Sequence, residues 1–176
     1  MSAETAPPEF SRMVDLRQIT AAPMQLAATE AERAALAARF GLVSLARLEA
    51  SIALEPAGPV VSASGRLVAE WVQPCAVSGE DLAQSADEPV AFRFVPERTD
   101  HTPDEEIELT ESELDEIEYA GTSFDVGEAV AQSLALAIDP FATGPGAEAA
   151  RKTAGIVSEG EASPFAALKG LKLGKD

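Results

Sequence analysis

Two consecutive segments with alternating apolar and polar side chains constrain this chain more than any other feature. Every second residue from Ala46 to Leu54 is apolar, and the same alternation runs from Val61 to Trp71, with one glycine in the apolar row. The residues between them, Glu55-Pro56-Ala57-Gly58-Pro59, are typical of turns. A period of two indicates a strand with one buried face. We therefore expect a long antiparallel hairpin, and Pro74 ends its second strand because proline cannot donate to a ladder.

Two helices are predicted from their capping residues. Thr29 and Glu32 have the spacing of a capping box ahead of an Ala-rich segment, and Gly41 fits a left-handed stop after it. Asp125 is in position to cap a second helix, whose apolar residues recur at helical spacing as far as Ile138. Each helix thus has an apolar stripe that can pack on a sheet.

Three further segments have the character of strands: residues 10–19, 90–95 and 117–119. Together with the hairpin they predict an α+β fold. We expect a mostly antiparallel, twisted sheet of about five or six strands, with the two main helices on one face. Whether the sheet closes into a barrel is left open.

The domain organisation follows from composition. We expect residues 1–9 to be disordered and residues 10–140 to form a single domain, within which the acidic segment at about 97–116 is a mobile loop. Residues 141–163 are rich in Gly and Ala with little periodicity. Residues 141–176 are therefore predicted to be a flexible linker that ends in a short amphipathic segment.

The charge of the chain is concentrated in its middle. There are 13 Lys and Arg against 30 Asp and Glu, a net charge of −17, and nearly all of the excess lies in residues 76–140. This charge argues against DNA binding or membrane binding driven by bulk electrostatics, because both depend on free cations. The parts of the chain on either side are nearly neutral, so local contacts with RNA stay possible.

The acidic segment has two interpretations. It can be a solvated loop that aids solubility, or a docking surface for a basic partner. In the second case the candidate docking residues are Asp104, Glu105, Glu106, Glu108, Glu111 and Glu113.

Cysteine and histidine are too few for several kinds of site. One Cys and one His exclude an internal disulfide, a Cys-based zinc site and a multi-His metal site. Cys75 has no basic neighbour or obvious helix N-terminus that would lower its pKa, so we expect a half-buried structural thiol. No nucleophile–base pair or phosphate-binding loop is evident, so we expect no enzymatic activity, cofactor or metal. No signal peptide or membrane span is evident, so we expect a cytoplasmic protein.

Four blocks of the chain resemble the YceD family when they are taken together. They are residues 39–50 (RFGLVSLARLEA), residues 65–77 with their GRLVA and QPCAV runs, residues 125–140, and residues 164–168 (PFAAL). The blocks occur in the order in which the family has them. The resemblance covers the chain from about Phe10 to Lys172.

The family is known as large ribosomal RNA subunit accumulation proteins. The resemblance implies a bacterial, cytoplasmic, non-enzymatic factor that supports synthesis, processing or stability of large-subunit ribosomal RNA. Relatives are often encoded beside a small basic ribosomal protein. Many relatives carry Cys-x-x-Cys where this chain has Cys75-Ala76-Val77-Ser78, and a basic residue is missing here from Phe141-Ala142-Thr143.

Two mechanisms are compatible with this role. The chain can contact large-subunit RNA directly, or it can act as an acidic escort that holds a basic large-subunit ribosomal protein. Direct contact would use scattered side chains, and the candidates are Arg12, Arg17, Arg66, Gln73, Lys169 and Lys172. The oligomeric state is left open.

Overall fold

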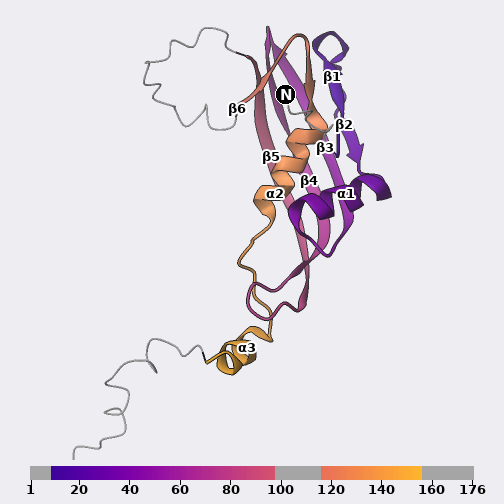
Figure 1. Cartoon of the computed structure of the whole chain (residues 1–176). Helices are drawn as coiled ribbons and strands as arrows, with labels where there is room; N and C mark the ends of the chain where they lie inside the picture. The colour runs from indigo at the N-terminus through magenta and orange to yellow at the C-terminus, as the bar shows by residue number, and fades with distance from the viewer. Residues whose placement is uncertain (1–8, 98–115, 156–176) are drawn as a thin grey trace, which may run out of the picture. The chain divides into compact units, whose positions relative to one another are not determined.

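The computed structural model describes residues 9–97 and 116–155 (Figure 1). Most of the predicted acidic loop and the predicted amphipathic C-terminal segment lie outside these residues, as does the predicted disordered N-terminus except for Glu9. The chain divides into two compact units. The first contains the described residues of 1–73 and 83–139, and the second contains Pro74–Leu82 and the described residues from Pro140 onward.

The fold is α+β, as the sequence predicts. In chain order, the elements are β1 (Met13–Asp15), a 3-10 helix (Leu16–Gln18), β2 (Met24–Ala27), α1 (Glu30–Phe40), β3 (Ser44–Ala57), β4 (Val60–Pro74), β5 (Asp81–Pro96), β6 (Glu116–Tyr119), β7 (Ser123–Asp125), α2 (Val126–Ala137) and α3 (Ala147–Thr153). Strands β2 to β6 form one sheet in sequence order, and β1 pairs with β7. The β2–β3 and β3–β4 pairs are antiparallel, whereas β5 and β6 are parallel.

The predicted hairpin is confirmed as β3 and β4. Leu48 and Ile52 on β3, and Leu67 and Trp71 on β4, are buried on the same inner face. One detail of the prediction is wrong, because Ala46 is exposed. The pairing register shifts between Leu45 and Arg47, so the alternation changes phase there and Leu45 faces the core instead.

Both predicted helix starts are confirmed. Thr29 Oγ1 accepts a hydrogen bond from Glu32 N at 3.3 Å, and Glu32 Oε2 accepts one from Thr29 N at 2.7 Å. Gly41 ends α1 with a φ of 67°, a left-handed conformation that favours glycine. Asp125 caps α2 by accepting from Glu128 N at 3.1 Å, and the same carboxylate accepts from Arg12 N at 2.7 Å.

A single hydrophobic core joins the inner face of the sheet to both main helices. Leu36 of α1 and Leu134 of α2 are fully buried in it with Phe94 of β5. The rings of Phe94 and Phe124 are stacked at 4.2 Å. Gly127 allows α2 to approach the N-terminal segment, because a Cβ there would lie 2.5 Å from the carbonyl oxygen of Phe10.

The three largest differences from the predicted boundaries are in the first strand, in β5 and in the linker. Only residues 13–15 of the segment 10–19 form a strand, and the chain then turns into the 3-10 helix, where Asp15 accepts from Arg17 N. Strand β5 begins at Asp81, nine residues before the predicted strand at Val90, and it contains Pro89. The predicted linker is wrong for residues 147–153, which form α3.

The second unit is built around a turn after β4. Cys75 N donates to Glu80 O at 2.7 Å, and Ala76 N donates to Ala142 O at 3.0 Å. Gly144 and Gly146 lie against this turn, beside the ends of the Leu82 and Glu80 side chains respectively. The segment before α3 therefore packs on the turn.

Candidate interaction surface

Arg12 is held in place by several partners. Its guanidinium forms a two-point ion pair with Glu32 at 2.7 and 3.0 Å and donates to Ala27 O at 3.2 Å. It also lies 4.5 Å from the centre of the Phe10 ring. Hydrogen bonding by Arg12 lowers the pKa of Glu32 to about 2. Arg12 thus connects the N-terminal segment to the start of α1.

Arg66 and Arg17 are both exposed but differ in their partners. Arg66 lies on the outer face of β4, and its Nε donates to Asp87 Oδ1 of β5 at 2.5 Å. This hydrogen bond lowers the pKa of Asp87. Arg17 lies in the 3-10 helix, and its side chain has no ion-pair partner among residues 9–97 and 116–155.

Gln73 is buried at the end of β4, with an exposed fraction of 4%. Trp71 Nε1 donates to its Oε1 at 2.7 Å, and its Nε2 donates to the carbonyl oxygen of Asp139 at 2.6 Å. The side chain therefore connects the inner face of β4 to the residues after α2. Arg66 and Gln73 are both on β4, but Arg66 is exposed and Gln73 is buried. Arg12 precedes β1 and Arg17 lies in the 3-10 helix, and the hydrogen bonds and ion pairs of these four side chains do not join them to one another. Lys169 and Lys172 lie outside the described residues.

Ion pairing extends to most other arginines in the described part of the chain. Arg39 binds Glu9 and Glu128, and Arg47 binds Glu49 at 2.7 Å and Glu70 at 3.7 Å. The remaining pairs are Arg93 with Glu116 and Arg151 with Glu148. The sequence does not predict most of these pairs, because most of the partners are far apart along the chain. Two pairs have a short spacing that could have indicated them: Arg47 with Glu49 on one strand face, and Arg151 with Glu148 three residues apart.

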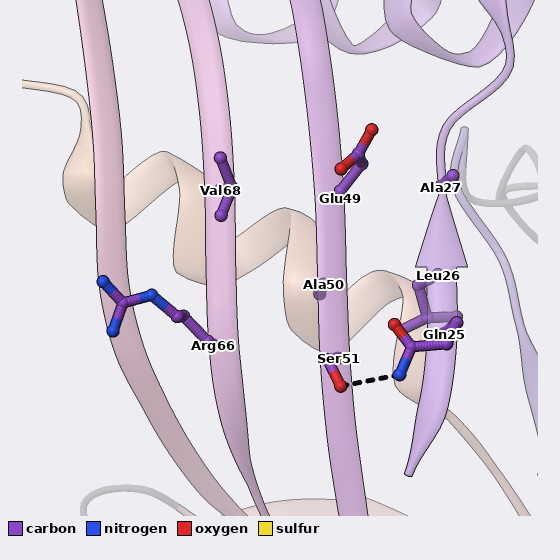
Figure 2. A pocket seen from close by; sticks show the side chains of 8 residues that line it. All are labelled: Gln25, Leu26, Ala27, Glu49, Ala50, Ser51, Arg66 and Val68. Carbon is purple, nitrogen blue, oxygen red and sulfur yellow. Dashed lines mark hydrogen bonds between the residues drawn. The ribbon is translucent and has the colours of Figure 1, made fainter.

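The outer face of the sheet carries a shallow hollow of about 360 Å³ across β2, β3 and β4 (Figure 2). Its lining residues are Gln25, Leu26, Ala27, Glu49, Ala50, Ser51, Arg66 and Val68. Figure 2 shows α2 behind the strands, so this face is the one opposite the core. Gln25 Nε2 donates to Ser51 Oγ at 2.8 Å. The Arg66 side chain extends away from Ser51 toward β5, where it meets Asp87.

Cys75 is buried, with an exposed fraction of 4%, and its environment differs from the prediction. Its Sγ accepts from Ser78 N and from Gly144 N, both at 3.4 Å. Hydrogen bonds from Ser78 and from these backbone N–H groups lower the pKa of the thiol to about 6. The sequence shows no basic neighbour or helix N-terminus that would lower this pKa; the donors that lower it come instead from a turn and from a distant loop, which the sequence does not reveal.

Residues 9–97 and 116–155 contain no group of three His, Cys, Asp or Glu side chains placed to hold a metal ion. Over the same residues, no helix has the length and hydropathy needed to cross a membrane.

Comparisons with known proteins give one match. The model of the family described as "Large ribosomal RNA subunit accumulation protein YceD" matches residues 63–172, which is more than half of the chain. No curated protein and no solved structure matches. The matched range begins inside β4, so the block at residues 39–50 lies outside it.

Proposed function

This chain belongs to the YceD family of large ribosomal RNA subunit accumulation proteins, and from this premise we propose that it acts as a non-enzymatic, cytoplasmic factor that binds a basic protein of the large subunit. Its role is in the production of large-subunit ribosomal RNA. By holding the basic protein until RNA takes it over, the chain would support synthesis, processing or stability of that RNA. In this mechanism the direct partner is a protein, and the effect on RNA is indirect.

The observation that carries this proposal is the ion pairing of the arginines. Affinity for RNA phosphates comes largely from cations that are free to replace counterions. Arg12, Arg39, Arg47, Arg66 and Arg93 each already bind a carboxylate within this chain. An RNA ligand would have to break these pairs, whereas a basic protein would be attracted by the net charge of −17.

The proposed docking residues in the acidic segment add to this mechanism. Asp104, Glu105, Glu106, Glu108, Glu111 and Glu113 lie in the most acidic stretch of the sequence. Such a stretch would steer a basic protein toward the chain and would be displaced when RNA competes for the same cations.

Direct contact with large-subunit RNA is the second candidate function. The observation in its favour is Arg17, which is exposed and has no ion-pair partner within residues 9–97 and 116–155. Lys169 and Lys172 would add cations at the other end of the sequence. A contact of this kind would depend on a few free cations and on RNA shape.

The two functions are separated by crosslinking in cells, with sequencing of the bound RNA and mass spectrometry of the bound proteins. The full chain is compared with a variant in which residues 100–116 are replaced by a neutral linker. The escort function predicts that the variant loses a large-subunit protein and that RNA recovery falls with it. Direct contact predicts that RNA crosslinking persists in the variant. Recovery of neither class of partner by the full chain would contradict both functions.

A further inference from the structure

The outer face of strands β2, β3 and β4 is not covered by the main helices, whereas the inner face is. The core and both main helices lie on the opposite side, and the hollow of about 360 Å³ interrupts the outer face between Gln25 and Val68. This volume is at the lower end of the range of about 300–1,000 Å³ found for pockets that hold ligands. Small residues create the hollow, since Ala27 and Ser51 stand where larger side chains would fill it.

The polar lining of the hollow includes acceptor oxygens of Glu49 and Gln25. Glu49 stands beside it on β3, with one carboxylate oxygen, Oε2, bound to Arg47 and the other without a hydrogen bond to residues 9–97 or 116–155. Gln25 uses its amide nitrogen to bind Ser51, which leaves its Oε1 as an acceptor. A cationic side chain is the ligand that such oxygens suit.

The cation nearest to the hollow does not satisfy these oxygens. Arg66 lines the hollow, but its guanidinium extends toward β5 and is bound there to Asp87. Arg47 is shared between Glu49 and Glu70 on the same face. The outer face therefore keeps an acidic excess around the hollow, with Glu55 farther along β3.

We infer that this hollow receives a lysine or arginine side chain from an extended basic segment of the protein partner. The inference rests on the proposed function for the class of partner and adds the place and mode of contact. The apolar stem of the incoming side chain would lie over Val68, and its charged end would reach the oxygens of Glu49 and Gln25. Neighbouring residues of the segment would lie across the open strands β3 and β4.

The test begins by identifying the partner. The immobilised full chain is incubated with proteins extracted from purified large ribosomal subunits, and the retained protein is identified by mass spectrometry. Its affinity for the full chain and for each variant is then measured by isothermal titration calorimetry at physiological salt. Thermal unfolding of each variant verifies that it is folded.

Charge variants on β3 separate the hollow from the general acidity of the chain. Glu49→Gln removes a carboxylate at the hollow, and we expect affinity to fall about 3- to 10-fold. Glu55→Gln is the matched control, since it removes the same charge from the same face of β3 away from the hollow. Arg47→Gln frees the Glu49 carboxylate from its partner, and we expect affinity to rise. Opposite changes in affinity for Glu49→Gln and Arg47→Gln would not be expected if these two residues only stabilised the fold.

A steric variant tests the shape of the site. Ser51→Trp places a large side chain in the hollow, and we expect a loss of at least about 10-fold in affinity. Ser62→Trp adds the same side chain to the outer face of β4 outside the lining of the hollow, and it should change affinity little.

The outcomes distinguish the two proposals. If the full chain retains a large-subunit protein, but Glu49→Gln and Glu55→Gln weaken binding equally and Ser51→Trp has no effect, the inferred site is wrong and the proposed function stands. If the full chain retains no such protein and binds protein-free large-subunit RNA instead, both are wrong.

Discussion

The two faces of the main sheet show how differently one pair of strands can be used. On the inner face, Leu48, Ile52, Leu67 and Trp71 are buried against the helices. On the outer face, the same strands carry charged side chains that bind one another, such as Arg47 with Glu49. Burial of apolar area supplies most of the stability of such a fold, whereas exposed ion pairs contribute little. The inner face therefore maintains the fold, and side chains on the outer face can change with little cost in stability.

Adjacent residues on β4 provide the largest expected contrast between the faces. Leu67 is 1% exposed on the inner face, and Val68 faces the outer side. Leu67→Ala should lower the free energy of unfolding by about 2–5 kcal/mol, because it removes buried methyl groups and leaves a cavity. Val68→Ala is the control and should cost less than about 1 kcal/mol. Urea unfolding measures both, and equal losses would contradict the assignment of the faces.

Gln73 tests whether a candidate RNA contact has a structural role. Gln73→Leu leaves the buried indole N–H of Trp71 without its acceptor, so we expect a loss of about 1–3 kcal/mol in the free energy of unfolding. Tryptophan fluorescence during urea unfolding reports on the same residue. A variant with unchanged stability but weaker RNA binding would favour the direct-contact function instead.

Acid should weaken the pair that joins Arg12 to Glu32. The pKa of Glu32 is about 2 in the folded chain and 4.5 for the unperturbed group, because Arg12 hydrogen-bonds its carboxylate. A carboxyl group whose pKa is lower in the folded chain than in the unfolded chain stabilises the fold at pH values above its pKa in the unfolded chain. This contribution is lost as pH falls from about 4.5 toward 2. Since the pair is partly exposed to solvent, we expect a loss of about 1–2 kcal/mol from this contribution.

The comparison with Glu32→Gln isolates that contribution. Both proteins are unfolded with urea at pH 6 and at pH 3, and the stability difference between them should shrink at the lower pH. A difference that stays constant over this range would show that the Arg12–Glu32 pair does not depress the pKa.

The smallest expected effect on stability is at Arg66 on the outer face. Arg66→Gln breaks the ion pair with Asp87. The side chains of Arg66 and Asp87 are both largely exposed. Solvent screens such a pair, so we expect no measurable change in the urea midpoint. A shift as large as that of Leu67→Ala would contradict the conclusion that the outer face contributes little to stability.

Local patterns made much of the fold predictable. The period-two segments gave the β3–β4 hairpin, and the Thr29–Glu32 box and Asp125 gave both main helix starts, because a capping residue acts within one turn of its helix. The early part of β5 was missed because its acidic residues and Pro89 resemble a loop. Pairing with β4 makes this segment a strand, because tertiary pairing overrides the local strand propensity of its residues.

The candidate surface was less predictable, for a physical reason. The partners of Arg12 and Arg66 are 20 and 21 residues away, and no local rule identifies them. The donors to Cys75 include Gly144 N, 69 residues away. The hollow depends on the register between β2, β3 and β4, which places Ser51 beside Gln25 and Arg66. Such sites come from tertiary pairing rather than from spacing along the sequence.

We propose that the chain acts through a basic protein rather than by holding RNA itself. The most direct measurement offers the purified full chain both components of the same large subunits, its extracted proteins and its protein-free RNA, in parallel titrations at physiological salt. We expect an identified basic protein to bind and the naked RNA not to bind. Binding of the naked RNA, with no subunit protein retained, would contradict this proposal.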